Sequence, residues 1–180
     1  MSSTLMPGPR TCTRGPVALC GKSRFMFVLG FLALGLLHSA ALHAETLLTL
    51  RTGDQTLEVS REQLQALPQH QVLTRTPWTE GVKDFRGPLM RDVLDLLDAP
   101  VADTAVLSLV AWNEYEVDVS ALDYRRWDVV LAHQLDGKPL TRVTNGPLWV
   151  VYPRDQNLEL QDSRVDYRWA WMLRSVVVKP

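Results

Sequence analysis

Six tryptophans are the side chains in this sequence whose type and setting best suit contact with a ligand. Trp78 and Trp112 lie among polar residues, in the segments Arg75-Thr76-Pro77-Trp78 and Trp112-Asn113-Glu114-Tyr115. An indole ring in such a place offers a flat face to a planar heterocycle, whose polar edge neighbouring side chains can bond. For either ring alone, a lid over the core is the alternative. Together with Trp149 they predict a ligand site, made of Arg75, Thr76, Trp78, Trp112, Asn113, Tyr115 and Trp149.

Other site chemistries have little support in the sequence. Beyond residue 44 the only histidines are His70 and His133, and both cysteines, Cys12 and Cys20, lie before that point. Metal sites need three or four ligands at recognisable spacing, so we expect no metal and interpret His133 as a packed strand residue. No histidine accompanies a serine nucleophile motif, and we assign no catalytic residue. The glycines occur singly beside turn residues, which argues against a phosphate-binding loop.

The first 44 residues have the pattern of a signal peptide. Four basic residues precede or adjoin the apolar run 25–37, and small residues follow it up to Ala44. That run is short for a bilayer span, so we predict export to the periplasm with cleavage after Ala44, or alternatively after Ala41. An uncleaved N-terminal anchor is the other alternative. No twin-arginine pair occurs, which favours export of an unfolded chain.

Residues 45–180 have the length of a single domain. They contain 15 basic and 20 acidic residues, a net charge of −5, which argues against a nucleic-acid partner. They contain no cysteine, so we expect an ordinary apolar core rather than disulfides to stabilise the domain. No further long apolar stretch follows, and we expect the processed chain not to span a membrane.

Apolar alternation and turn residues predict many short strands, over residues 46–60 (a hairpin turning at Gly53-Asp54), 71–76, 106–110, 115–119, 127–134, 148–152 and 175–178. Ser60 and Gln63 form a capping box that opens a short helix. Gly87-Pro88 is predicted to start a second helix through Leu97, and 121–124 a third turn of helix. Residues 154–166 show no periodicity and are interpreted as a polar loop. The prediction is an α+β fold: a single domain with a mixed β-sheet and short helices.

Five motifs in one order resemble the molybdopterin-binding domain of the sulfite oxidase family, over roughly residues 70–178. They are Phe85-Arg86-Gly87-Pro88-Leu89, Tyr115 after a turn, Val130-Leu131-Ala132, Asp136-Gly137-Lys138-Pro139-Leu140 and Gly146-Pro147-Leu148. The resemblance implies that fold and a pterin or molybdopterin-like ligand. Family enzymes hold molybdenum through a cysteine in the loop that corresponds here to Arg75–Trp78, and Trp149 stands where they have arginine. Because this loop has no cysteine, we expect a relative without the metal.

The resemblance also suggests a role. Small exported members of this fold resemble periplasmic pterin-binding regulators that act on a membrane-bound signalling enzyme, such as a cyclic-di-GMP enzyme or a histidine kinase. We therefore predict a periplasmic pterin-binding sensory protein, more a non-catalytic relative than an enzyme. Its expected partners are a small-molecule pterin and a membrane-bound sensor. The alternatives are a molybdopterin-dependent oxidoreductase and a structural interaction domain without a ligand.

Overall fold

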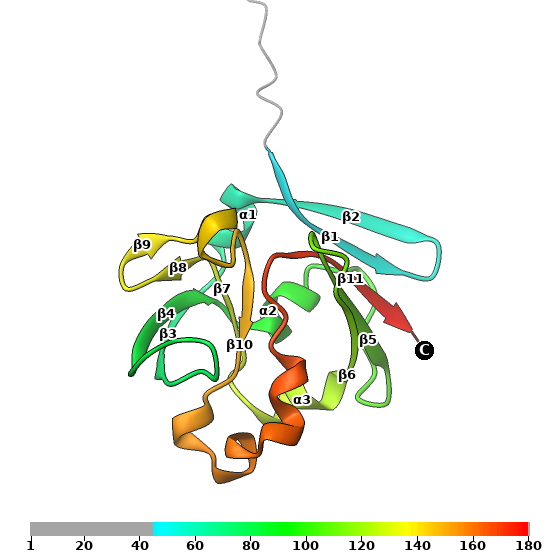
Figure 1. Ribbon diagram of the computed structural model, residues 1–180. Helices are drawn as coiled ribbons and strands as arrows, with labels where there is room; N and C mark the ends of the chain where they lie inside the picture. The colour runs from blue at the N-terminus through cyan, green and yellow to red at the C-terminus, as the bar shows by residue number, and fades with distance from the viewer. Residues whose placement is uncertain (1–44, 180) are drawn as a thin grey trace, which may run out of the picture. The chain divides into compact units, whose positions relative to one another are not determined.

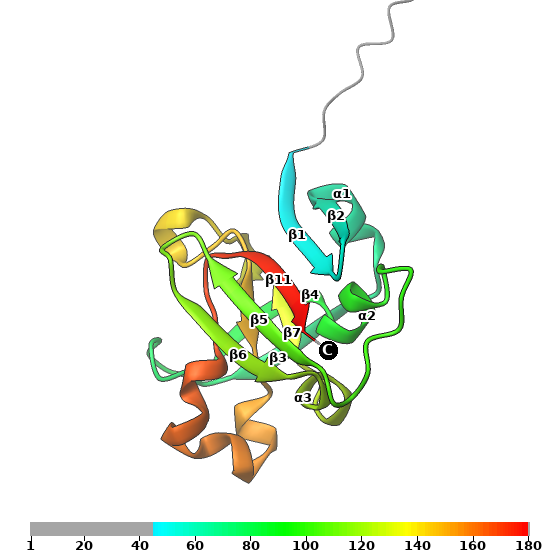
Figure 2. The ribbon, with the colours of Figure 1, turned by 90° about the vertical axis from the view of Figure 1, so that its right-hand side faces the viewer.

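A five-stranded mixed sheet forms one side of the structure, a computed structural model that describes residues 45–179. Its strand order is β2-β1-β11-β5-β6 (Figures 1 and 2). The strands are β1 (Thr46–Thr52), β2 (Gln55–Ser60), β5 (Val106–Ala111), β6 (Glu116–Ser120) and β11 (Leu173–Lys179). β1 and β11 pair in parallel, with Thr49 opposite Ser175, and the other neighbours are antiparallel. The predicted mixed sheet is confirmed.

The predicted hairpin and capping box are confirmed in detail. Gly53 adopts a left-handed φ of +52° at the turn between β1 and β2, a conformation that glycine reaches without steric cost. The Ser60 hydroxyl accepts the Gln63 backbone N–H at 3.3 Å, and the Gln63 side chain accepts the Ser60 N–H at 2.8 Å. This cap opens α1 (Arg61–Ala66), which ends before Pro68. Local side-chain chemistry therefore decides both features.

Two smaller sheets build the opposite side of the fold (Figure 1). Antiparallel strands in the order β3-β4-β8-β9 form one small sheet, and β7 pairs with β10 in another. Their bounds are β3 (Gln69–Thr74), β4 (Lys83–Pro88), β7 (Val130–Ala132), β8 (Gln134–Leu135), β9 (Lys138–Pro139) and β10 (Trp149–Val151). All residues of β7 and β10 are buried, so these two strands run through the core.

The second helix is shorter than the sequence predicts, and the third is two residues longer. α2 spans Met90–Leu94 and α3 spans Ala121–Arg126. The prediction that Gly87-Pro88 starts a helix is wrong, because both residues end strand β4. A Cβ on Gly87 would lie 2.0 Å from the Leu131 carbonyl oxygen, so glycine allows β4 to approach β7 closely. That requirement comes from a residue 44 positions away, which no local pattern reveals.

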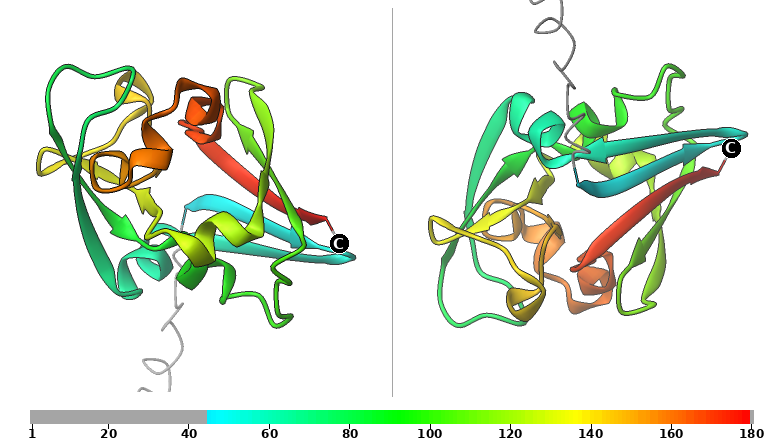
Figure 3. Two further views of the ribbon diagram at one scale, coloured as in Figure 1. Left: turned by 90° about the horizontal axis from the view of Figure 1, so that it is seen from below. Right: turned by 90° about the horizontal axis from the view of Figure 1, so that it is seen from above.

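The predicted polar loop after β10 contains a series of short 3₁₀ helices. They are η2 (Arg154–Gln156), η3 (Leu158–Gln161) and η4 (Ser163–Arg168), while η1 (Arg142–Thr144) precedes β10. η2 contacts β3 and η4 contacts β6, so this segment lies between the two sheets (Figure 3, left, orange). It thereby brings together the chain segments that follow β3 and precede β6.

None of the helices within residues 45–179 has the length and apolar character needed to cross a bilayer. The predicted signal peptide and its cleavage site fall on residues 1–44, outside the described part of the chain. Export and removal of a leader therefore stay predictions.

Candidate functional site

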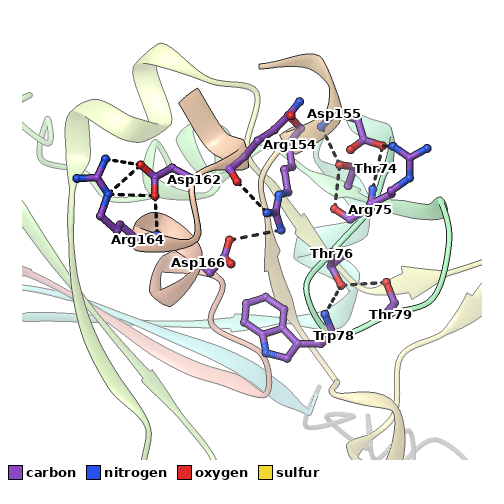
Figure 4. Close-up of polar contacts among 11 residues, drawn as sticks. Thr74, Arg75, Thr76, Trp78, Thr79, Arg154, Asp155, Asp162, Arg164 and Asp166 are labelled. Carbon is purple, nitrogen blue, oxygen red and sulfur yellow. Dashed lines mark hydrogen bonds and ion pairs between the residues drawn. The ribbon is translucent and has the colours of Figure 1, made fainter. Parts of the chain in front are cut away.

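The loop between β3 and β4 carries three of the predicted site residues, and hydrogen bonds fix its shape. Thr76 is 6% exposed, and its hydroxyl accepts the Trp78 backbone N–H at 3.1 Å. The same hydroxyl lies 2.9 Å from the Thr79 hydroxyl (Figure 4). Such side-chain-to-backbone bonds define a turn. Thr76 therefore holds the loop that presents Trp78, rather than offering a free donor to a ligand.

The Trp78 ring packs against the rings of two other tryptophans, Trp169 and Trp171. Its ring centroid lies 4.9 Å from that of Trp171 in an edge-on arrangement and 6.0 Å from that of Trp169. Edge-to-face contacts of this kind contribute about 0.5–1.5 kcal/mol each beyond the area that they bury. Trp78 is nevertheless 41% exposed. The loop thus presents a partly exposed indole ring whose orientation is fixed by its contacts with Trp169 and Trp171.

Trp149 lies in the core beneath this group, which we call the tryptophan cluster (Trp78, Trp149, Trp169 and Trp171). It is fully buried, with its ring centroid 6.1 Å from that of Trp171 and 5.3 Å from that of Phe85. Its indole N–H has no hydrogen-bond partner among the described residues. Trp149 therefore supports Trp171 from inside the fold and presents no face at the surface.

The other predicted group, Trp112, Asn113 and Tyr115, lies in the turn from β5 to β6. Trp112 is 44% exposed, but the guanidinium carbons of Arg142 and Arg174 lie 4.6 and 5.9 Å from its ring centroid. The Asn113 side-chain oxygen accepts the Tyr115 backbone N–H at 3.3 Å, which shapes the turn. Arginine side chains therefore already occupy the neighbourhood of this ring.

The segment 167–172 connects the two predicted groups. The Tyr115 hydroxyl donates to the Tyr167 carbonyl oxygen at 2.8 Å, and the Trp112 backbone N–H donates to the Met172 carbonyl oxygen at 2.8 Å. Trp169 and Trp171 of the same segment contact Trp78. The structure therefore brings both groups against one stretch of six residues. The aromatic-rich sequence from Tyr167 to Trp171 is the one signal in this stretch that could have singled it out.

Arg75 lies at the rim of the loop, where it pairs with η2. Its side chain is 67% exposed, with a nitrogen 3.4 Å from an Asp155 carboxylate oxygen. The Arg75 backbone N–H donates to the same oxygen at 3.2 Å, and the Asp155 N–H donates to the Thr74 hydroxyl at 3.2 Å (Figure 4). An exposed pair of this kind contributes at most about 1 kcal/mol. Its structural effect is to dock the loop on the 3₁₀ segment.

Two charged residues of that segment, Arg154 and Asp166, were not predicted. Their side chains are 19% and 17% exposed, and the Arg154 Nη1 atom lies 3.5 Å from Asp166 Oδ1. Asp166 Oδ1 is buried without a hydrogen-bond partner in the described chain. Burial raises the pKa of the Asp166 carboxyl above its ordinary value, and the Arg154 guanidinium opposes that shift. The sequence interpretation as an aperiodic polar loop gave no reason to single out either residue.

Metal chemistry of the thiolate type does not fit this donor set. Across residues 45–179 there is no cysteine, and no three His, Asp or Glu side chains gather as possible ligands. His133, 6% exposed, bonds Gln69 Oε1 through Nε2 at 2.8 Å, and burial lowers its pKa. That placement agrees with the interpretation as a packed residue. The residues at the tryptophan cluster can stack on a ring and bond its edge, but they offer no soft metal ligand.

Comparison with known proteins identifies the fold. No protein-family model and no curated protein matches the chain. Among solved structures it is similar to the sulfane dehydrogenase SoxCD from Paracoccus pantotrophus, with a TM-score of 0.54 and 14% sequence identity. The fold is shared. The match covers 73% of this chain and 37% of the SoxCD chain, so this protein spans well under half of that one. It confirms the predicted α+β fold of the sulfite oxidase type, and at this identity it shows the fold alone.

Proposed function

We propose that this protein binds a pterin-type heterocycle on the exposed face of Trp78. The observation that carries the proposal is the setting of this ring, 41% exposed yet fixed edge-on against Trp171 at 4.9 Å. An aromatic ring that is already held in place binds a planar ligand with little further loss of side-chain entropy. A surface tryptophan that only covered the core would have no need of such an exposed face.

The fold and the sequence motifs support the same class of ligand. Motifs in the sequence resemble those of molybdopterin-binding domains, and the chain shares its fold with a sulfane dehydrogenase. The loop that would carry a metal-binding cysteine has Thr76 and Trp78 instead. The proposal is therefore a pterin or molybdopterin-like ligand held by stacking and hydrogen bonds, without a metal–thiolate bond.

We further propose a sensory role in the periplasm. The predicted leader and the acidic, cysteine-free mature region support export. Ligand binding against the 3₁₀ segment would favour one arrangement of that segment, which a membrane-bound signalling enzyme would recognise. A coupling of about 1–3 kcal/mol between ligand and partner is enough for such regulation.

The alternative function is a molybdopterin-dependent oxidoreductase, and the likeness to a dehydrogenase fold favours it. Metal analysis of protein purified from the periplasm separates the two. Stoichiometric molybdenum together with turnover of a sulfite or sulfoxide would establish the oxidoreductase. Metal-free protein that carries a pterin, identified by mass spectrometry of the released ligand, would establish the binding protein.

The direct test is calorimetric titration with a panel of pterins, accompanied by quenching of tryptophan fluorescence. Trp78→Ala is expected to weaken binding by about 10-fold or more, since stacking of one ring on an aromatic side chain contributes about 1–3 kcal/mol. Trp127→Phe is the control, because Trp127 packs against Tyr152 outside the cluster. Unchanged affinity in Trp78→Ala would refute the assignment of the site. No binding of any pterin by the wild type would favour a structural interaction domain.

A further inference from the structure

The carboxylate of Asp166 has unsatisfied bonding capacity. The side chain is mostly buried and pairs with Arg154, whose Nη1 atom lies 3.5 Å from Asp166 Oδ1, but that oxygen accepts no hydrogen bond from the described residues. A buried polar atom without a partner destabilises a fold, so such atoms are few and each has a reason. Asp155 and Asp162 of the same segment also pair with arginines, but their carboxylates accept hydrogen bonds as well, from Arg75 and Arg164 respectively.

Asp166 belongs to the neighbourhood of the exposed indole ring. Trp169, whose ring contacts that of Trp78, donates its backbone N–H to the Asp166 carbonyl oxygen at 3.2 Å. Figure 4 shows the Asp166 carboxylate, the Arg154 guanidinium and the Trp78 ring together beside the loop. A ligand stacked on Trp78 would therefore have a carboxylate and a guanidinium within reach of its edge.

The other polar groups predicted to bond a ligand are already engaged. The Thr76 hydroxyl bonds within its loop, the Asn113 oxygen accepts a backbone N–H, and Arg75 pairs with Asp155. A ligand edge would have to displace these bonds. At Asp166 the ligand edge would donate hydrogen bonds to an oxygen that has none in the fold. Binding there is more favourable than binding at a group whose existing hydrogen bond must first be broken.

We propose that Asp166 and Arg154 recognise the pyrimidine edge of the heterocycle and select one with a 2-amino-4-oxo pattern. Such an edge presents two adjacent N–H donors followed by a carbonyl acceptor. The Asp166 carboxylate accepts both donors, as it would accept the two parallel donors of a guanidinium. Arg154 donates to the Gln161 carbonyl oxygen through Nη2 at 3.0 Å, and its Nη1, beside Asp166, donates to the ligand carbonyl. A 2,4-dioxo edge places a carbonyl oxygen against the carboxylate and is rejected. This inference rests on the proposed binding of a pterin at Trp78 and adds which ring edge is selected.

The test compares pterin with lumazine, its 2,4-dioxo analogue, by calorimetry on the wild-type protein and Asp166→Asn. The wild type is expected to bind pterin about 10-fold or more tightly than lumazine, since bonds to a charged group discriminate strongly. In Asp166→Asn the pterin affinity falls by a similar factor. Lumazine binding is unchanged or improves, because an amide can donate to its 2-oxo group.

Asp162→Asn is the matched control. It removes the same charge four residues earlier, from a partly exposed carboxylate that pairs with Arg164, and asparagine still caps the start of η4. Its pterin-to-lumazine ratio is expected to equal that of the wild type.

Two results would overturn the inference. One is a wild-type protein that binds pterin and lumazine equally, which needs no variant to fold. The other is an unchanged ratio in folded Asp166→Asn. If either occurs while Trp78→Ala still weakens pterin binding about 10-fold or more, the proposed function stands and only the edge assignment is lost. If the wild type binds neither compound, both are lost.

Discussion

Replacement of Gly87 by alanine tests the closest approach between two strands in the core. An added Cβ would lie 2.0 Å from the Leu131 carbonyl oxygen, 2.7 Å from its carbonyl carbon and 3.0 Å from the Ala132 Cα atom. All three are backbone atoms of β7, which cannot rotate away as a side chain can. Since a relaxed carbon-to-oxygen contact is about 3.3 Å, the strands must separate locally by about 1 Å.

The cost of that separation follows from the packing around β7. Its three residues and the three of β10 are all fully buried, so neither strand has space to move into. Overpacking of a filled core costs about 1–3 kcal/mol. Because the clash is with backbone and the surroundings are filled, we expect Gly87→Ala to lower the free energy of unfolding by about 3 kcal/mol. That is a large share of the 5–15 kcal/mol typical of a domain.

Urea denaturation followed by tryptophan fluorescence measures this loss, with an unchanged slope against denaturant as the sign that only stability has altered. Gly53→Ala is the control. Gly53 has a φ of +52° but no atom within 4 Å of its added Cβ, so alanine there costs only left-handed strain of about 1–2 kcal/mol. A Gly87→Ala protein within 0.5 kcal/mol of the wild type, a threshold of about the size of an ordinary surface change, would refute the close approach.

Two further predictions concern stability. Ser60→Ala removes the capping box of α1 and is expected to cost about 1 kcal/mol in the same denaturation assay. Ser60→Thr should retain most of the stability, because its hydroxyl can still accept the Gln63 N–H and donate to Glu62. His133 has a pKa lowered from 6.5 by burial, so the unfolded chain binds a proton more readily than the native one. The free energy of unfolding should therefore fall as the pH drops below 6.5 toward the native pKa. His133→Gln should lose that part of the pH dependence. If the free energy of unfolding of the variant varies with pH as that of the wild type does, the pH dependence does not come from His133.

Local features of the fold could be predicted from the sequence, and long-range ones could not. The turn at Gly53 and the cap at Ser60 depend on neighbours within three residues, and both predictions are confirmed. The end of β4 at Gly87-Pro88 was predicted as a helix start, because that dipeptide is also a helix-opening signal. Its true constraint is the distance to Leu131, which depends on the folded chain.

The candidate site divides in the same way. Trp78 stood out because tryptophan in a polar segment is unusual, and the structure places it at the surface on other tryptophans. Trp149 was predicted beside the ligand, but it lies in the core. The sequence could not reveal this, because an apolar strand gives no indication of which of its residues reach the surface. Asp166 was overlooked because short 3₁₀ turns have no sequence period, and its missing partner is visible only after folding.

The position of β11 has a consequence for how the protein is assembled. The β1–β2 and β5–β6 hairpins each pair sequence neighbours, but only β11 joins them, between β1 and β5 (Figure 2). Residues 173–179 are synthesised after both hairpins, so the two halves of the large sheet cannot be joined until β11 has emerged. Such pairing of distant segments is slow, because the chain loses entropy on closing the loop before the new contacts stabilise it. Until β11 pairs with both hairpins, β1 and β5 each present an unpaired strand edge to which another chain can add.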